Sequence, residues 1–268
     1  MKVLVLPDVH GRKFWRKVIA DNIGNIDKVI FLGDYLDPYE NEIDENPELM
    51  ECDDFYDCKN LLKMLEDIIS LKKNKPNKYI LLTGNHSDSY IWSKFHAATR
   101  TDYRNWEKYH KFFSQNLEYF NLVWIENDVI FSHAGISEGW AKKVWETLEF
   151  PENELFSIKE IAEVLRDTPL SKFNEYYIRR IGDISHYRDG DMFYGSSEWA
   201  DLREHIDCKN STSSNLIPIG KDEIYQVFGH TQLKHPLIND KWACLDCRKP
   251  FIIDTITHNI EDGSNSSL

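Results

Sequence analysis

The sequence predicts an α/β protein built around a mostly parallel sheet. Short apolar runs at residues 2–6, 28–32 and 79–82 are typical of buried strands. Apolar residues at helical spacing lie between them, at 14–20 and 61–71. Strands that alternate with helices in this way form parallel pairs joined by right-handed crossovers, so we expect these three strands to share one sheet.

The rest of the chain predicts further helices and short strands, within one domain over residues 1–260. A helix is expected at 102–117, and the stretch 138–180 is also helical in pattern. The weakly periodic stretch that follows is rich in Gly, Ser, Asp and aromatic residues, so residues 138–215 are a candidate cap insertion. The tail at 261–268 is expected to be disordered. Short strands are expected at 122–125, 129–131, 224–228, 242–245 and 251–253.

Composition and charge exclude several classes of protein. The chain has 268 residues, 41% of them hydrophobic, which is enough to bury one substantial core. No apolar run approaches the roughly 20 residues of a membrane span, and the run at residues 3–6 is too short for a signal peptide. A formal net charge of −13 argues against a partner such as long nucleic acid. We therefore expect a cytoplasmic enzyme with no membrane partner.

The segment at residues 37–57 is strongly acidic. It contains ten carboxylates and no Lys or Arg. Such a charge run predicts a solvated loop of low order. An alternative is an acidic lid that repels polyanions, since the segment follows directly after one of the motifs below.

Six side chains suited to metal binding lie in five short blocks. They are Asp8 and His10 in PDVHG, Asp34 in GDYLD, Asn85 in GNH, His133 in SHAG and His230 in GHT. Ligands bind outside the carboxyl ends of strands in parallel sheets, so Asp8, Asp34 and Asn85 are expected at one sheet edge. Asp8 and His10 are expected to point the same way, because residues i and i+2 of an extended segment share a side.

Oxygen and imidazole ligands without thiolates are typical of a catalytic metal site. We predict two divalent cations, with Mn²⁺ as the first choice and Fe or Zn²⁺ as alternatives. A carboxylate such as Asp34 can bridge two cations about 3.5–4 Å apart, which then hold the attacking and leaving oxygens of a displacement at phosphorus. A single Asp-x-His or a single His would be ordinary structure. Five blocks in this order predict an active site.

The blocks resemble those of the calcineurin-like metallophosphoesterase superfamily, from Asp8 to about Asp246. GDYLD, GNH, SHAG and GHT are most similar to the branch that contains the Ser/Thr phosphoprotein phosphatases and the symmetrical diadenosine tetraphosphate hydrolases. The resemblance implies a central β-sandwich flanked by helices, in four α-β-β-α layers. It also implies a dinuclear site and attack on phosphorus by a metal-bridging hydroxide.

Residue roles follow from the resemblance. His86 would be the general acid that protonates the leaving oxygen, and Asp37 would orient it. Arg188, in HYRDG, resembles part of the family's later substrate loop, so Arg188 and Asn85 are the candidate substrate-binding residues. The first metal would be held by Asp8 and His10, both metals by the bridging Asp34, and the second metal by Asn85, His133 and His230.

Three departures from the family pattern bear on the substrate. The phosphoprotein phosphatases have an Arg where this chain has Pro38, and a Glu where it has Ser87. The residue that binds phosphate must therefore lie elsewhere. Many nucleases of the superfamily end in Gly-His-x-His, whereas this chain has Gln232 in the last position. The missing second His favours monoesters over nucleic acids.

The sequence thus predicts a metallophosphatase for phosphomonoesters, with a phosphorylated small molecule, a nucleotide or a phosphoprotein as substrate. Two enzymatic alternatives remain open: a nucleotide phosphohydrolase of the diadenosine tetraphosphate type, and a phosphodiesterase or nuclease. A non-enzymatic alternative is a binding scaffold that kept the fold and lost the chemistry. Its sequence sign would be lost ligands, and all six are present.

Overall fold

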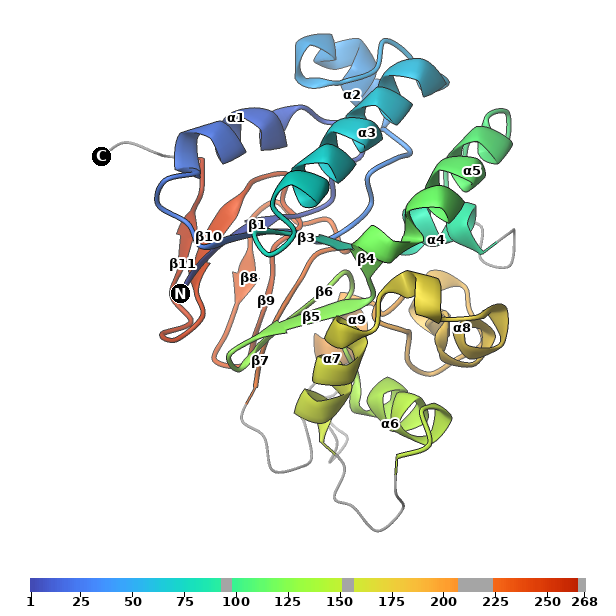
Figure 1. Cartoon of the computed structure of the whole chain (residues 1–268), viewed down its shortest axis with the longest axis vertical. Helices are drawn as coiled ribbons and strands as arrows, with labels where there is room; N and C mark the ends of the chain where they lie inside the picture. The colour runs from blue at the N-terminus through green and yellow to red at the C-terminus, as the bar shows by residue number, and fades with distance from the viewer. Residues whose placement is uncertain (93–97, 151–156, 207–223, 265–268) are drawn as a thin grey trace. The chain divides into compact units, whose positions relative to one another are not determined.

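The computed structural model describes residues 1–92, 98–150, 157–206 and 224–264. It contains two mixed sheets flanked by helices (Figure 1), which confirms the predicted fold class. The chain divides into two compact units. Unit 1 comprises Met1–Phe120 and Arg248–Leu268, and unit 2 comprises Asn121–Cys247. Among the described helices, none combines the length and the apolar character needed to cross a membrane.

The larger sheet has six strands in the order β11-β10-β1-β2-β3-β4. The pairs β1–β2 and β2–β3 are parallel, as the alternation of strands and helices predicts, and β10 adds to β1 antiparallel. Residues 3–6 of β1 have no exposed surface, so this strand, which lies between β10 and β2, is buried on both faces. The strands are β1 (Lys2–Leu6), β2 (Lys28–Phe31), β3 (Tyr79–Leu82), β4 (Phe120–Asn121), β10 (Phe251–Asp254) and β11 (Ile260–Asp262).

Helices of unit 1 cover this sheet. Helices α1 (Phe14–Asn22) and α3 (Cys58–Asn74) lie on the same side of it (Figure 1). Most of the apolar residues that predicted α3 lie on its buried face, and Asp57 caps its first turn by accepting a hydrogen bond from Asn60 N at 3.1 Å. The next two helices, α4 (Asn85–Ile91) and α5 (Trp106–Asn116), pack against each other.

The acidic segment at 37–57 is ordered, contrary to the expectation of a loose loop. It forms α2 (Glu40–Glu45) and a 3₁₀ turn at Pro47–Leu49. Glu42 is buried because two arginines reach it, with Arg12 Nε at 2.7 Å and Arg248 Nη2 at 2.6 Å. Both arginines lie outside the segment, so its own charge run could not reveal them.

The C-terminal tail also differs from the expectation. Glu261 and Asp262 belong to β11, which pairs antiparallel with β10. Gly263 N donates a hydrogen bond to Pro250 O at 2.9 Å, which extends the pairing by one contact. Residues 265–268 lie outside the described part of the chain.

Unit 2 contains a five-stranded sheet in the order β5-β6-β7-β9-β8. Strands β5 (Val123–Glu126) and β6 (Val129–Ser132) form the predicted hairpin, and Asn127 at its turn has a positive φ of 57°. Strand β7 (Tyr225–Phe228) pairs in parallel with β6 and with β9 (Trp242–Cys244), and β8 (Leu237–Ile238) closes the edge.

The helices of unit 2 are short. The predicted helical stretch at 138–180 is divided into α6 (Glu138–Thr147), α7 (Ile158–Asp167) and α8 (Glu175–Ile181), and α7 packs against β5. Helix α9 (Leu202–Ile206) follows. The single domain at 1–260 with a cap at 138–215 stays a prediction, and residues 207–215 lie outside the described part.

Candidate active site

The carboxyl ends of β1, β2 and β3 carry three of the five blocks. Asp8 follows β1, Asp34 follows β2, and Asn85 begins α4 directly after β3. The first two blocks are joined through the backbone, because Val9 N and His10 N both donate to Asp34 O, at 3.0 and 2.7 Å. The parallel sheet thus gathers residues that lie far apart in the sequence.

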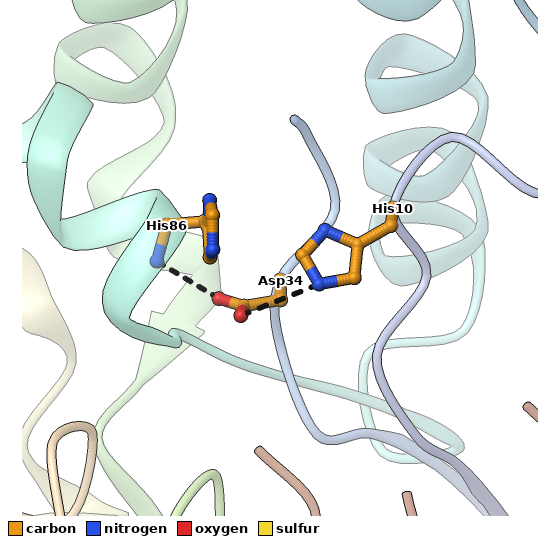
Figure 2. Close-up of side chains that lie close together, drawn as sticks. All are labelled: His10, Asp34 and His86. Atoms are coloured by element: carbon orange, nitrogen blue, oxygen red, sulfur yellow. Dashed lines mark hydrogen bonds and ion pairs between the residues drawn. The ribbon is translucent and has the colours of Figure 1, made fainter. Parts of the chain in front are cut away.

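His10, Asp34 and His86 lie close enough to share one ion, and Asp8 lies next to His10. His10 Nε2 is 3.7 Å from Asp34 Oδ2 and 3.9 Å from Asp8 Oδ2. The backbone N–H of His86 donates to Asp34 Oδ1 at 3.0 Å (Figure 2). Among the described residues, possible ligand atoms of His10, Asp34 and His86 all lie within 4.8 Å of one another. All these residues are buried.

The hydrogen bond of His10 decides which ring nitrogen can bind a metal. Nδ1 lies 2.7 Å from Leu36 O. A carbonyl oxygen can only accept, so Nδ1 carries the proton and Nε2 keeps its lone pair toward the carboxylates. Burial, and then the neighbouring His86, lower the pKa of His10 well below its ordinary value. A neutral imidazole with its free nitrogen facing carboxylates fits a metal ligand.

The local backbone differs from the predicted extended segment. His10 has φ of 43°, Asp34 of 47° and Asp37 of 58°, in the left-handed region. The alternation argument for Asp8 and His10 was therefore wrong about the backbone, although the two side chains do lie near each other. Non-glycine residues in this region cost free energy and occur often at functional sites.

His86 is held by a second buried group. Its Nδ1 lies 2.6 Å from Asp37 Oδ2, and Tyr90 donates its hydroxyl hydrogen to Asp37 Oδ1. Burial raises the pKa of Asp37, and the hydrogen bonds from His86 and Tyr90 only partly oppose this. The sequence analysis missed Tyr90. The available signal was its spacing, since residues four apart on a helix share a face.

The position of His86 is compatible with two chemical roles, general acid and metal ligand. Because Nδ1 bonds Asp37, Nε2 is the nitrogen left for chemistry. It could protonate a leaving oxygen, as the resemblance implies, or join His10 and Asp34 around an ion. The rings of His10 and His86 lie 4.9 Å apart, so the distances allow both.

The two remaining predicted ligands lie together in unit 2. His133 follows β6 and His230 follows β7, and these strands are parallel neighbours. His133 Nε2 lies 3.0 Å from His230 Nδ1, and Gly229 N donates to His133 O at 2.7 Å. The second-ion role of both histidines stays a prediction.

Arg188 also lies in unit 2, in a 3₁₀ turn at His186–Arg188. Its Nε is 2.6 Å from Asp201 Oδ2, and its Nη2 donates to Thr231 Oγ1 at 2.9 Å. Asp201 also pairs with Arg203, so one carboxylate is shared by two guanidinium groups. The role of Arg188 in binding phosphate stays a prediction.

Gly33 allows the backbone of the GDYLD block to lie close to that of the GNH block. Its φ is 120°, and a Cβ there would lie 2.8 Å from Gly84 N. We expect Gly33→Ala to lower the free energy of unfolding by about 2–5 kcal/mol through backbone strain and overpacking. Denaturant titration of both proteins measures this. Gly24→Ala is the control, since a Cβ there meets nothing within 4 Å, and an equal loss in both variants would contradict the argument.

One family profile matches this chain, and solved structures of other proteins resemble it. The profile of the calcineurin-like phosphoesterase family matches residues 1–232. A solved cold-active protein tyrosine phosphatase is 15% identical with a TM-score of 0.52, over 98% of this chain and 79% of that one. A protein serine/threonine phosphatase from Saccharomyces cerevisiae, with similarity to human phosphatase PP5, is 14% identical with a TM-score of 0.49, over 100% and 77%.

At 15% identity, the first of these likenesses shows a shared fold. No curated protein matches the chain significantly. The family profile is the broader finding, because it covers residues 1–232 of 268. The chain therefore belongs to the calcineurin-like phosphoesterase family and is a hydrolase acting on phosphoric esters.

Proposed function

We propose that this chain is a metal-dependent phosphatase for phosphomonoesters, with Mn²⁺ as the first metal to test and Fe or Zn²⁺ as alternatives. One observation carries the proposal: His10 Nε2 lies within 4 Å of carboxylate oxygens of both Asp8 and Asp34, and all three are buried. Two buried carboxylates beside the same neutral imidazole favour a divalent cation, because buried negative charges are costly unless an opposite charge offsets them. Nitrogen and oxygen donors without thiolate suit a catalytic ion.

The proposal includes a second ion, held by Asn85, His133 and His230 together with Asp34. This part rests on the resemblance of the blocks GNH, SHAG and GHT to those of the family. When bound, the ions would supply Lewis-acid stabilisation of the charge at phosphorus and activate the attacking water.

A side chain of the protein, rather than an ion, would protonate the leaving group. His86 is the proposed general acid, with Nε2 giving its proton to the leaving oxygen. Asp37 accepts a hydrogen bond from Nδ1 and Tyr90 holds Asp37 from the other side, so the ring keeps one orientation. A fixed ring matters because proton transfer requires the donor within hydrogen-bond reach of the leaving oxygen.

The preference for monoesters rests on Gln232, which stands where many nucleases of the superfamily have a second His. The test is hydrolysis of p-nitrophenyl phosphate beside bis(p-nitrophenyl) phosphate with added Mn²⁺, using Asp34→Ala as the blank. We expect the monoester to be the better substrate by kcat/KM. Preference for the diester would contradict the proposal and direct the search to cyclic nucleotides and nucleic acids.

A further inference from the structure

Three guanidinium groups surround Tyr39 in unit 1; we name them the arginine cluster. The Cζ atom of Arg100 lies 3.7 Å from the centre of the Tyr39 ring, and those of Arg12 and Arg248 lie 5.6 Å away. The same ring lies 5.3 Å from the ring of His10. The cluster is therefore next to the proposed metal ligands, in a chain whose net charge is −13.

Two members of the cluster have structural partners. Arg12 donates to both oxygens of Glu42, at 2.7 and 3.1 Å, and to Asp8 O at 3.0 Å. Arg248 reaches the same carboxylate at 2.6 Å. These contacts explain why the acidic segment is ordered. They also use most of the donors of Arg12.

Arg100 differs from both. Its Nε donates to Asp37 O at 3.3 Å, and its Nη1 reaches only Thr99 Oγ1, at 3.5 Å. Its Nη2 is buried without a hydrogen-bond partner, and no carboxylate of the described residues forms an ion pair with Arg100. A buried donor without a partner is costly, so the position favours a ligand that supplies an acceptor.

We infer that Arg100 binds the phosphate of the substrate and that its charge selects the dianionic monoester over the monoanionic diester. The inference rests on the proposed function and names the residue that the motifs left open. Its contact with Asp37 O places it beside the residue that orients His86, and Tyr39 places it beside His10. A guanidinium is suited to this role because its planar fork matches two phosphate oxygens.

Tyr39 supports Arg100 in two ways. Its ring face attracts the cation and holds the guanidinium plane in one orientation, which reduces the entropy lost on binding. Arg100 itself has φ of 62°, a left-handed backbone conformation that is uncommon for residues other than glycine.

The experiment compares wild type, Arg100→Gln and Arg100→Lys, with Arg104→Gln as the matched control. Arg104 also stacks on a tyrosine, with Cζ 3.8 Å from the ring of Tyr56, but acidic residues line its pocket, among them Glu40 and Asp53. Two readouts are needed. Calorimetric titration of the full chain with inorganic phosphate gives the dissociation constant without turnover, and steady-state kinetics with Mn²⁺ give KM and kcat for the monoester and the diester.

We expect Arg100→Gln to weaken phosphate binding and raise KM for the monoester by about tenfold to a hundredfold, the effect of one charge-assisted hydrogen-bond pair. KM for the diester should rise less, Arg100→Lys should recover part of the loss, and Arg104→Gln should match wild type. Unchanged phosphate binding in Arg100→Gln would overturn the inference while leaving the proposed function intact. A wild type that hydrolyses neither ester would refute the proposed function, and the titration would still decide whether Arg100 binds phosphate.

Discussion

Asp34→Asn is expected to lower turnover by about 10²-fold or more and to reduce the number of divalent ions bound per chain. Asp34 Oδ2 lies 3.7 Å from His10 Nε2, and Oδ1 accepts the backbone N–H of His86. The substitution keeps an oxygen for that N–H, so the fold should survive, but it removes the charge that attracts a cation. Lewis-acid stabilisation at phosphorus is worth several kcal/mol, which corresponds to the expected loss.

The measurement combines turnover of p-nitrophenyl phosphate with metal analysis of the dialysed protein. Asp57→Asn is the matched control, because Asp57 is also a carboxylate with a local structural role, at the N-cap of α3. Asparagine is a good N-cap, so this variant should keep the stability, metal content and turnover of wild type. Full metal content and turnover in Asp34→Asn would show that the ligand assignment is wrong.

The fold could be predicted where the pattern is local. The strands at β1, β2 and β3 lie within a residue of the apolar runs that predicted them, because strands buried on both faces are continuously apolar. The acidic segment could not be predicted in this way. Its order depends on Arg12 and Arg248, which come from opposite ends of the chain. A charge run indicates disorder only when no distant partner neutralises it.

The candidate site shows a similar division. The residues that form the site could be predicted from the five sequence blocks, because the carboxyl ends of parallel strands meet at one edge of the sheet. The geometry of the site depends on details that residue types do not specify. Two examples are the left-handed backbone at His10 and the hydrogen bond from Nδ1 to Leu36 O, which leaves Nε2 for a ligand.

Arg100 illustrates the remaining gap. Arg100 lies in none of the five blocks, and it is 63 positions from the residue whose carbonyl it contacts. Only the structure shows that its guanidinium stacks on Tyr39 beside the proposed ligands. Substrate-binding residues on loops are harder to predict than metal ligands, because a phosphate can be bound from many directions.

His86→Ala should leave metal content unchanged and lower kcat by roughly 10²–10⁴ if His86 is a general acid. The loss should depend on the leaving group. Nitrophenolate leaves readily without a proton, so p-nitrophenyl phosphate should lose less than phenyl phosphate or a phosphoserine peptide. Tyr90→Phe should give a smaller loss with the same dependence, since it removes only the hydroxyl that bonds Asp37.

His110→Ala is the control for His86→Ala. Its imidazole Nδ1 lies 2.8 Å from Tyr90 O, so it contacts the same helix α4 without a proposed role in chemistry. The alternative role of His86 predicts a different result. If Nε2 binds an ion beside His10 and Asp34, His86→Ala loses metal together with activity, and every leaving group loses equally. Metal content and leaving-group dependence therefore separate the two roles, because loss of a ligand removes the ion for every substrate, whereas loss of the acid affects most the substrates whose leaving oxygen needs a proton.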